Sequence, residues 1–148
     1  ELAAGVVPDI VTLAKSLGSG IPVGACLVNN TVSSSIKEND LGTTFGGGMI
    51  AMAAVIATLE AIEKDGMLGN AKAIEQKLRA AELKGVRSIR GKGCLLGIEC
   101  TGNAGDTFNR LLESGIITGT SSDPKVLRLL PPLNTSLDDL DILIKELS

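Results

Sequence analysis

Two short apolar runs, separated by a glycine-rich segment, constrain the fold of this chain most strongly. Residues 10–14 and 23–28 are rich in β-branched and aliphatic side chains, and each run stops at turn-forming residues. Runs of four to eight such residues are typical of buried β-strands. We therefore expect two buried strands in the interior of a sheet, with Lys15 at the carboxyl end of the first strand.

Helix-forming segments and further short strands follow. Residues 49–64 are dense in Ala, Ile, Met, Leu and Glu, which predicts a long helix. Residues 70–83 place apolar side chains at helical spacing, which predicts an amphipathic helix. The remaining predicted elements are strands at residues 86–89, 93–100, 116–117 and 126–130, a helix at 106–114 and a final helix opened by Ser136. This alternation predicts an α/β fold, with one domain over residues 1–64 and another over residues 65–148.

Composition excludes several classes of function. A formal net charge of -3 and an aromatic content of 1% leave neither a basic stripe nor stacking platforms, which argues against a nucleic-acid partner. The absence of histidine removes the commonest general base and metal ligand, so we expect no metal site and acid–base chemistry from Lys, Asp, Glu or a cofactor. Three cysteines without metal-type spacing, and no apolar run of roughly 20 residues, predict a soluble cytoplasmic protein with reduced thiols and no membrane partner.

Lys15 has two competing interpretations. In the simpler one, its side chain emerges into solvent where the strand ends. In the other it is a Schiff-base lysine, because burial disfavours the charged ammonium and lowers its pKa, and the neutral amine attacks a carbonyl carbon. The carboxyl ends of parallel strands are also where α/β sheets bind ligands. Lys15 alone does not decide between the two.

Two further candidate sites stand out. The first is Gly-Thr-Thr-Phe-Gly-Gly-Gly at residues 42–48, where Thr43, Thr44 and a helix N-terminus suit a phosphate, although a plain helix start after a glycine hinge is the alternative. The second is Arg128, which lies in an apolar stretch. We expect it to be buried against a carboxylate, of either a substrate or a structural Glu. Residues 90–93, in contrast, are predicted to form a turn with solvated charges.

Four segments, in this order, resemble the class III (ornithine-type) aminotransferases, most closely the acetylornithine and succinylornithine transaminase branch. They are residues 8–25 with Pro-Asp-Ile-Val-Thr-Leu-Ala-Lys, 42–47 with Gly-Thr-Thr-Phe-Gly-Gly, 90–99 with Arg-Gly-Lys-Gly, and 126–133 with Val-Leu-Arg-Leu-Leu-Pro-Pro-Leu. The resemblance implies the C-terminal part of a pyridoxal-phosphate-dependent transferase of fold type I. Residues 1–64 then match the end of the large domain with its linking helix, and residues 65–148 match the small α+β domain.

The resemblance also implies a role for each candidate residue. Lys15 forms the aldimine with pyridoxal 5'-phosphate and moves protons, while Thr44 reaches the cofactor phosphate of the neighbouring subunit in a homodimer. Thr43 lies near the substrate, and Arg128 helps to bind the carboxylate of the substrate or of glutamate, either directly or through an ion pair. The implied transaminase, of arginine biosynthesis, moves an amino group from an ornithine derivative to 2-oxoglutarate. Two alternatives stay open: a truncated, non-catalytic module of such an enzyme, and a related enzyme such as an aminomutase.

Overall fold

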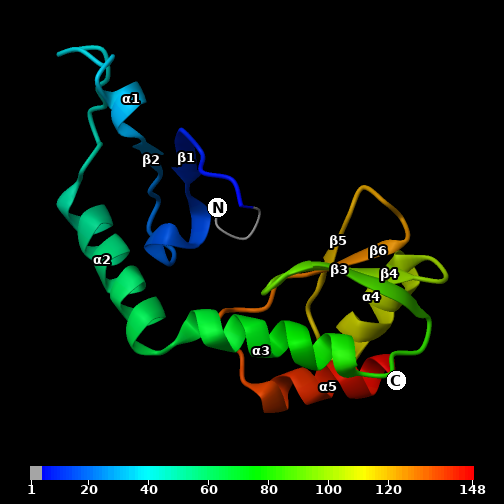
Figure 1. Cartoon of the computed structure of the whole chain (residues 1–148). Helices are drawn as coiled ribbons and strands as arrows, with labels where there is room; N and C mark the ends of the chain where they lie inside the picture. The colour runs from blue at the N-terminus through cyan, green and yellow to red at the C-terminus, as the bar shows by residue number, and fades with distance from the viewer. Residues whose placement is uncertain (1–4) are drawn as a thin grey trace. The chain divides into compact units, whose positions relative to one another are not determined.

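The computed structural model describes residues 5–148 of the chain. The chain divides after Ala61 into two compact units, and Figure 1 labels the helices and strands of both. Among residues 5–148, no helix combines the length and the apolar composition that crossing a bilayer requires.

A two-stranded antiparallel sheet forms the centre of the first unit, in a register that sets Ile10 opposite Val28. Asn29 closes this sheet, because its side-chain amide donates a hydrogen bond to the Asp9 carboxylate at 2.5 Å. The Asn29 side-chain oxygen also accepts from the Val32 amide at 2.9 Å and so caps the next helix. The elements of this unit, with the helix that crosses its boundary, are β1 (Ile10–Leu13), the 3-10 helix η2 (Lys15–Gly18), β2 (Ala25–Val28), α1 (Asn30–Ser33) and α2 (Met49–Lys64).

Both strands of the first unit lie within two residues of their predicted bounds, whereas the prediction that they are buried is wrong. Ile10 is 53% exposed and Leu13 is 40% exposed. The physical reason is that among residues 5–148 these strands pair only with each other, so no further strand flanks them. They are also antiparallel, so the rule for ligand sites at parallel strand ends does not apply to this pair. The long helix predicted over residues 49–64 is confirmed as α2.

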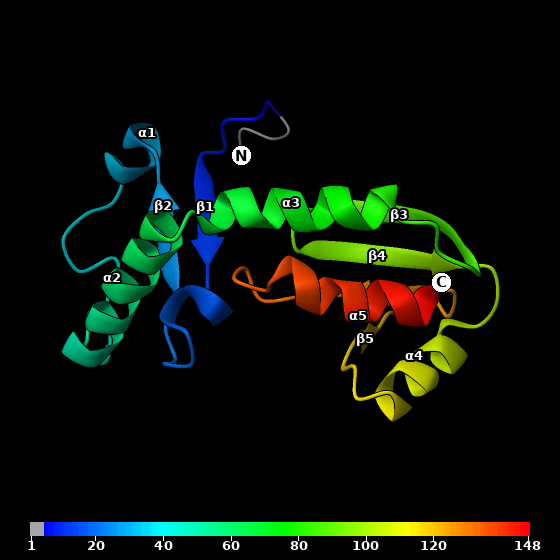
Figure 2. The ribbon, with the colours of Figure 1, turned by 90° about the horizontal axis from the view of Figure 1, so that it is seen from below.

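The second unit is a four-stranded antiparallel sheet with the strand order β3-β4-β6-β5. Helices α3 and α5 lie side by side on one face of this sheet, as Figure 2 shows. Most predicted elements of this unit are confirmed, with bounds that shift by up to three residues. The elements are α3 (Met67–Ala80), β3 (Val86–Lys92), β4 (Leu95–Cys100), α4 (Ala104–Glu113), β5 (Gly119–Thr120), β6 (Val126–Leu129) and α5 (Leu137–Leu147).

The core of the second unit lies between the sheet and its helices. Alternation along β4 points Leu96 and Ile98 into this core, while Leu95 lies on the opposite face and is 63% exposed. On β6, Leu127 points the same way as Ile98, its partner in the β4–β6 register. Side chains from all three helices complete the core: Ile74, Leu78, Ala104, Leu111, Leu140, Leu143 and Leu147. The face opposite the helices carries Leu95 and Val126 together with Gly97 and Arg128.

Two local predictions in this unit are wrong. Residues 116–117 are not a strand, because they complete the end of α4: the Ile116 amide donates to the Leu111 carbonyl at 2.8 Å, and the Gly115 amide donates to the Leu112 carbonyl at 3.0 Å. This pair of bonds, with Gly115 at φ +78°, is the Schellman arrangement that ends many helices. Residues 90–92 continue β3 instead of forming a turn, and the hairpin turns at residues 93–94.

Candidate active site

Lys15 lies where β1 ends, in a backbone conformation that long side chains rarely adopt. Its φ is +57°, and among residues 5–148 only two other non-glycine residues, Ser19 and Asn39, have positive φ. Such a conformation costs on the order of 1–3 kcal/mol and persists where the surrounding structure imposes it. Lys15 is therefore a residue whose backbone is held against its own preference.

The turn that imposes this conformation is tightly determined. The Ile21 amide donates to the Gly18 carbonyl at 3.0 Å, and the Leu17 amide donates to the Ala14 carbonyl at 3.2 Å. Gly18 is buried, and a Cβ added there would lie 2.7 Å from Cγ1 of Val23. Because only glycine fits at this point, the turn after β1 has little freedom to relax around Lys15.

The Lys15 side chain is exposed, so it emerges into solvent as in the simpler of the two interpretations, and residues 5–148 do not provide the burial that the Schiff-base interpretation assumed. The cause is the uncovered two-stranded sheet from which the residue emerges. Among residues 5–148, Lys15 forms no ion pair. A primary amine at a rigid turn, free of a carboxylate and open to solvent, can react with a carbonyl group that is brought to it.

The Thr43–Thr44 segment forms an exposed turn before α2. The Gly46 amide donates to the Thr43 carbonyl at 3.4 Å, and a Cβ added at Gly46 would lie 2.3 Å from the Thr43 methyl group. The next residue along, Phe45, is 88% exposed. Two hydroxyl groups thus lie at the surface ahead of a 16-residue helix. This placement leaves Thr44 exposed, as a contact with a phosphate group requires.

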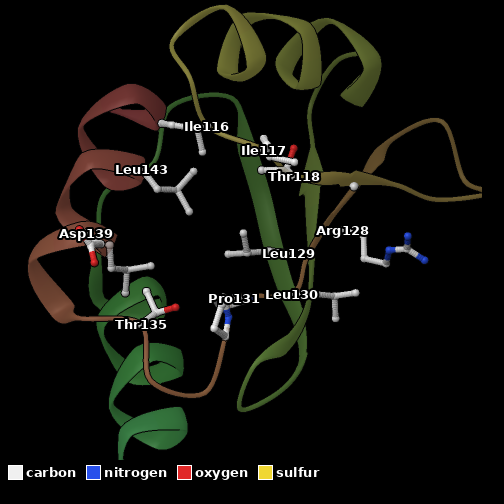
Figure 3. Close-up of a pocket in the computed structure, with 13 residues that line it drawn as sticks. Ile116, Ile117, Thr118, Arg128, Leu129, Leu130, Pro131, Thr135, Asp139 and Leu143 are labelled. Carbon is white, nitrogen blue, oxygen red and sulfur yellow. The ribbon is translucent and has the colours of Figure 1, made fainter. Parts of the chain in front are cut away.

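Arg128 lies in the middle of β6, on the face of the sheet opposite the helices. The prediction that it is buried is wrong, because the apolar character of its neighbours belongs to the other face: Leu127 and Leu129 point into the core, and alternation turns Arg128 outward. Figure 3 shows its guanidinium directed away from Leu143 and the core side of the sheet. Among residues 5–148 no carboxylate forms an ion pair with Arg128, so its donors are available.

A mostly apolar cavity of about 370 Å³ lies between β6, the segment before β5 and α5 (Figure 3). Leu129, Leu140 and Leu143 supply apolar wall. Thr118, Thr135 and Asp139 are among its polar lining residues, and the Thr118 hydroxyl is buried with no hydrogen-bond partner within residues 5–148. The Arg128 side chain also borders a second hollow, of about 330 Å³, on the face away from the helices.

Sequence reasoning missed a pair of charged residues that fastens the β3–β4 hairpin to α3. The Arg79 guanidinium donates to the Ile89 carbonyl at 2.5 Å and to the Gly91 carbonyl at 2.9 Å. Glu75 accepts from the Gly93 amide at 2.6 Å and pairs with Arg79 at 2.9 Å. The Gly93 amide first, and Arg79 second, hold the pKa of the Glu75 carboxyl below its ordinary value. The only sequence signal for this Glu75–Arg79 pair is the spacing of four residues between Glu and Arg on one helix.

The predicted site residues fall in both units of the chain. Lys15, Thr43 and Thr44 lie in the first, and Arg128 lies in the second. Thr43 and Thr44 share one turn, whereas Lys15 occupies a separate turn of the same unit.

Comparison with known proteins gives consistent results. The family model described as "Aminotransferase class-III" matches residues 1–148. Acetylornithine aminotransferase 1 of Bordetella pertussis is 40% identical over 148 residues, covering 96% of this chain and 37% of its own length. Acetylornithine aminotransferase of Bacillus subtilis is 43% identical over 141 residues, and the match covers 92% of this chain and 36% of that protein. The chain thus spans little more than a third of the length of these curated relatives.

Solved structures of two such proteins have a similar fold. Acetylornithine aminotransferase from Elizabethkingia anophelis superposes with a TM-score of 0.82 at 29% identity, covering 99% of this chain and 42% of that one. Plasmodium falciparum ornithine delta-aminotransferase superposes with a TM-score of 0.79 at 31% identity, and the match covers 99% of this chain and 41% of that one.

Proposed function

Because the chain belongs to the class III aminotransferases and has the α/β fold of part of a fold type I transferase, we propose that it carries the cofactor-bearing lysine of an acetylornithine-type aminotransferase. The proposed reaction moves an amino group from an ornithine derivative to 2-oxoglutarate. The observation that carries the proposal is Lys15, an accessible amine on a backbone held at positive φ. Backbone strain of this kind gathers at active sites, where it fixes a reacting side chain in position.

Lys15 fits pyridoxal 5'-phosphate because it offers a primary amine that the cofactor's aldehyde can reach from solvent. When bound, the cofactor supplies a ring that withdraws electrons from the substrate α-carbon. Lys15 holds the cofactor covalently at rest. Once a substrate amine has displaced Lys15 from the cofactor, the freed ε-amine would take the proton from the substrate α-carbon as a general base and deliver it to the cofactor as a general acid.

Thr43, Thr44 and Arg128 have proposed binding roles. The Thr44 hydroxyl donates a hydrogen bond to the cofactor phosphate of the neighbouring subunit in a homodimer, and Thr43 lies near the substrate. Arg128 binds a substrate carboxylate, for which the planar fork of a guanidinium provides two parallel donors. Its exposure and its freedom from ion pairs within residues 5–148 support this role.

The proposed domain division assigns residues 1–64 to the large domain with its linking helix and residues 65–148 to the small domain. The separation of the chain into compact units after Ala61 supports it. A homodimer agrees with the apolar surface of α2, where Met49 and Ile50 are exposed.

Chemical trapping tests the assignment of Lys15. The protein is incubated with pyridoxal 5'-phosphate, reduced with borohydride, digested and mapped by mass spectrometry. We expect the adduct on Lys15 and its loss in Lys15→Arg, while the control Lys37→Arg, at another exposed lysine of the same unit, keeps it. An adduct spread over several lysines, or one that survives Lys15→Arg at full yield, would refute the proposal.

The lack of any layer covering β1 and β2 within residues 5–148 favours a second candidate, a non-catalytic module of such an enzyme. Titration with the cofactor separates the two. The visible absorbance band of a lysine-bound cofactor is expected for the catalytic protein, and its absence at saturating cofactor supports the module.

A further inference from the structure

Arg128 is flanked by glycine on both neighbouring strands. The register pairs it with Gly97 of β4 on one side and with Gly119 of β5 on the other. Residues paired across antiparallel strands share one face of the sheet, and their side chains normally pack against each other. At Arg128 both partners lack a side chain, so the guanidinium has free space on either side.

The two glycines differ in what occupies that space. A Cβ added at Gly119 would lie 3.0 Å from Nε and 3.3 Å from Nη2 of Arg128, closer than ordinary van der Waals contact. The guanidinium therefore lies against the β5 backbone, in the volume that a side chain at Gly119 would fill. A Cβ added at Gly97 would instead lie 3.1 Å from Cγ1 of Val126 and would come no closer than 4 Å to Arg128 among its nearest neighbours.

Within residues 5–148, no carboxylate orients this guanidinium. Among residues 5–148 it has no ion pair, and β6 fixes only the start of a long side chain. A binding group that is already held in its bound conformation loses less entropy when its ligand arrives. Contact with the β5 backbone reduces the conformational freedom of the Arg128 guanidinium before a ligand binds.

We propose that Gly119 is a positioning residue for Arg128: because it has no side chain, the guanidinium rests on the β5 backbone, where its donors meet a substrate carboxylate. The inference depends on the proposed carboxylate-binding role of Arg128. Gly119 itself touches neither substrate nor cofactor.

The substitution Gly119→Ala isolates this effect. The φ of Gly119 lies outside the left-handed region, so alanine adds no backbone strain there, and its methyl group meets the flexible end of an arginine. The guanidinium must shift by a few tenths of an ångström. Since a misplacement of about 1 Å can cost roughly 100-fold in rate, we expect a loss of roughly three- to tenfold in carboxylate binding.

The experiment uses the holoenzyme and two readouts: the kcat and KM for 2-oxoglutarate, and the dissociation constant of glutarate by calorimetry. Glutarate has two carboxylates but no reacting carbonyl. Gly119→Ala should raise the KM and the dissociation constant together by roughly three- to tenfold, with kcat within about twofold and an unchanged melting temperature. Gly102→Ala is the matched control, because a Cβ there meets nothing within 4 Å, and it should change neither quantity.

The same change in an Arg128→Gln background completes the test. We expect Gly119→Ala to have no further effect there, because the guanidinium that its methyl group would displace is gone. If Arg128→Gln weakens glutarate binding while Gly119→Ala does not, the positioning role is overturned and the carboxylate role of Arg128 stands. If Arg128→Gln leaves glutarate binding unchanged, both are overturned. An equal effect of Gly119→Ala with and without Arg128 would also overturn the positioning role.

Discussion

Leu95 and Leu96 are adjacent in β4, have the same side chain and point to opposite faces of the sheet. Leu95 is 63% exposed, whereas Leu96 is 1% exposed and belongs to the core of the second unit. Replacing each by alanine removes the same atoms from two different environments. The pair therefore tests the orientation of the strand that adjoins β6, on which Arg128 lies.

The expected magnitudes follow from these exposures. Leu96→Ala removes three buried carbons at about 0.8 kcal/mol each, and the cavity that remains raises the loss of unfolding free energy to about 3–4 kcal/mol. For Leu95→Ala only about a third of that transfer free energy applies, or roughly 1 kcal/mol, with no enclosed cavity.

Urea unfolding followed by far-UV circular dichroism measures both losses. With a slope of about 1.5 kcal/mol/M, the midpoint should fall by roughly 2 M for Leu96→Ala and by under about 0.7 M for Leu95→Ala. Losses within about 1 kcal/mol of each other would refute the orientation. A reversed order would show that β4 is shifted by one residue, since such a slip exchanges the two faces of a strand.

Two further predictions concern the β3–β4 hairpin. The hydrogen bond from the Gly93 amide keeps the pKa of the Glu75 carboxyl below its ordinary value of 4.5. The stabilisation from Glu75 is therefore complete above that value and is lost as the pH falls through the lower, folded-state pKa. Unfolding measured across an acid titration should show this loss in the native chain and not in Glu75→Gln. Gly91→Ala should lower the melting temperature strongly, since φ is +103° and the new Cβ would overlap the Leu95 carbonyl, whereas the Gly102→Ala control should leave thermal unfolding unchanged.

Local sequence signals were sufficient to predict the elements that are determined by neighbouring residues in the chain. The composition of residues 49–64 predicted α2, and Ser136 was correctly identified as the start of α5, where its hydroxyl accepts from the Asp139 amide at 3.0 Å. Both depend on residues within one or two turns of the chain. The family followed from four short segments, and the match over the whole chain confirms it.

Predictions that depended on distant partners fared worse. The burial of β1 requires neighbours that an apolar run does not specify, and the exposure of Arg128 depends on which face of β6 the helices cover. The segment at residues 116–117 has strand-like composition, yet the Ile116 amide closes the end of α4 because Gly115 permits the necessary turn. The contact between the Arg128 guanidinium and Gly119 depends on the register between β5 and β6, which composition alone does not set.

The hydrogen bonds that Arg79 donates to β3 have a consequence for solubility. β3 is an outer strand of its sheet, and free carbonyls on such a strand can template pairing with another chain. Arg79 already donates to two of these acceptors, at Ile89 and Gly91, and places a positive charge beside them. An incoming strand would have to displace a guanidinium to dock there. The opposite outer strand, β5, is only two residues long and offers little to pair with, so both borders of the sheet resist self-association.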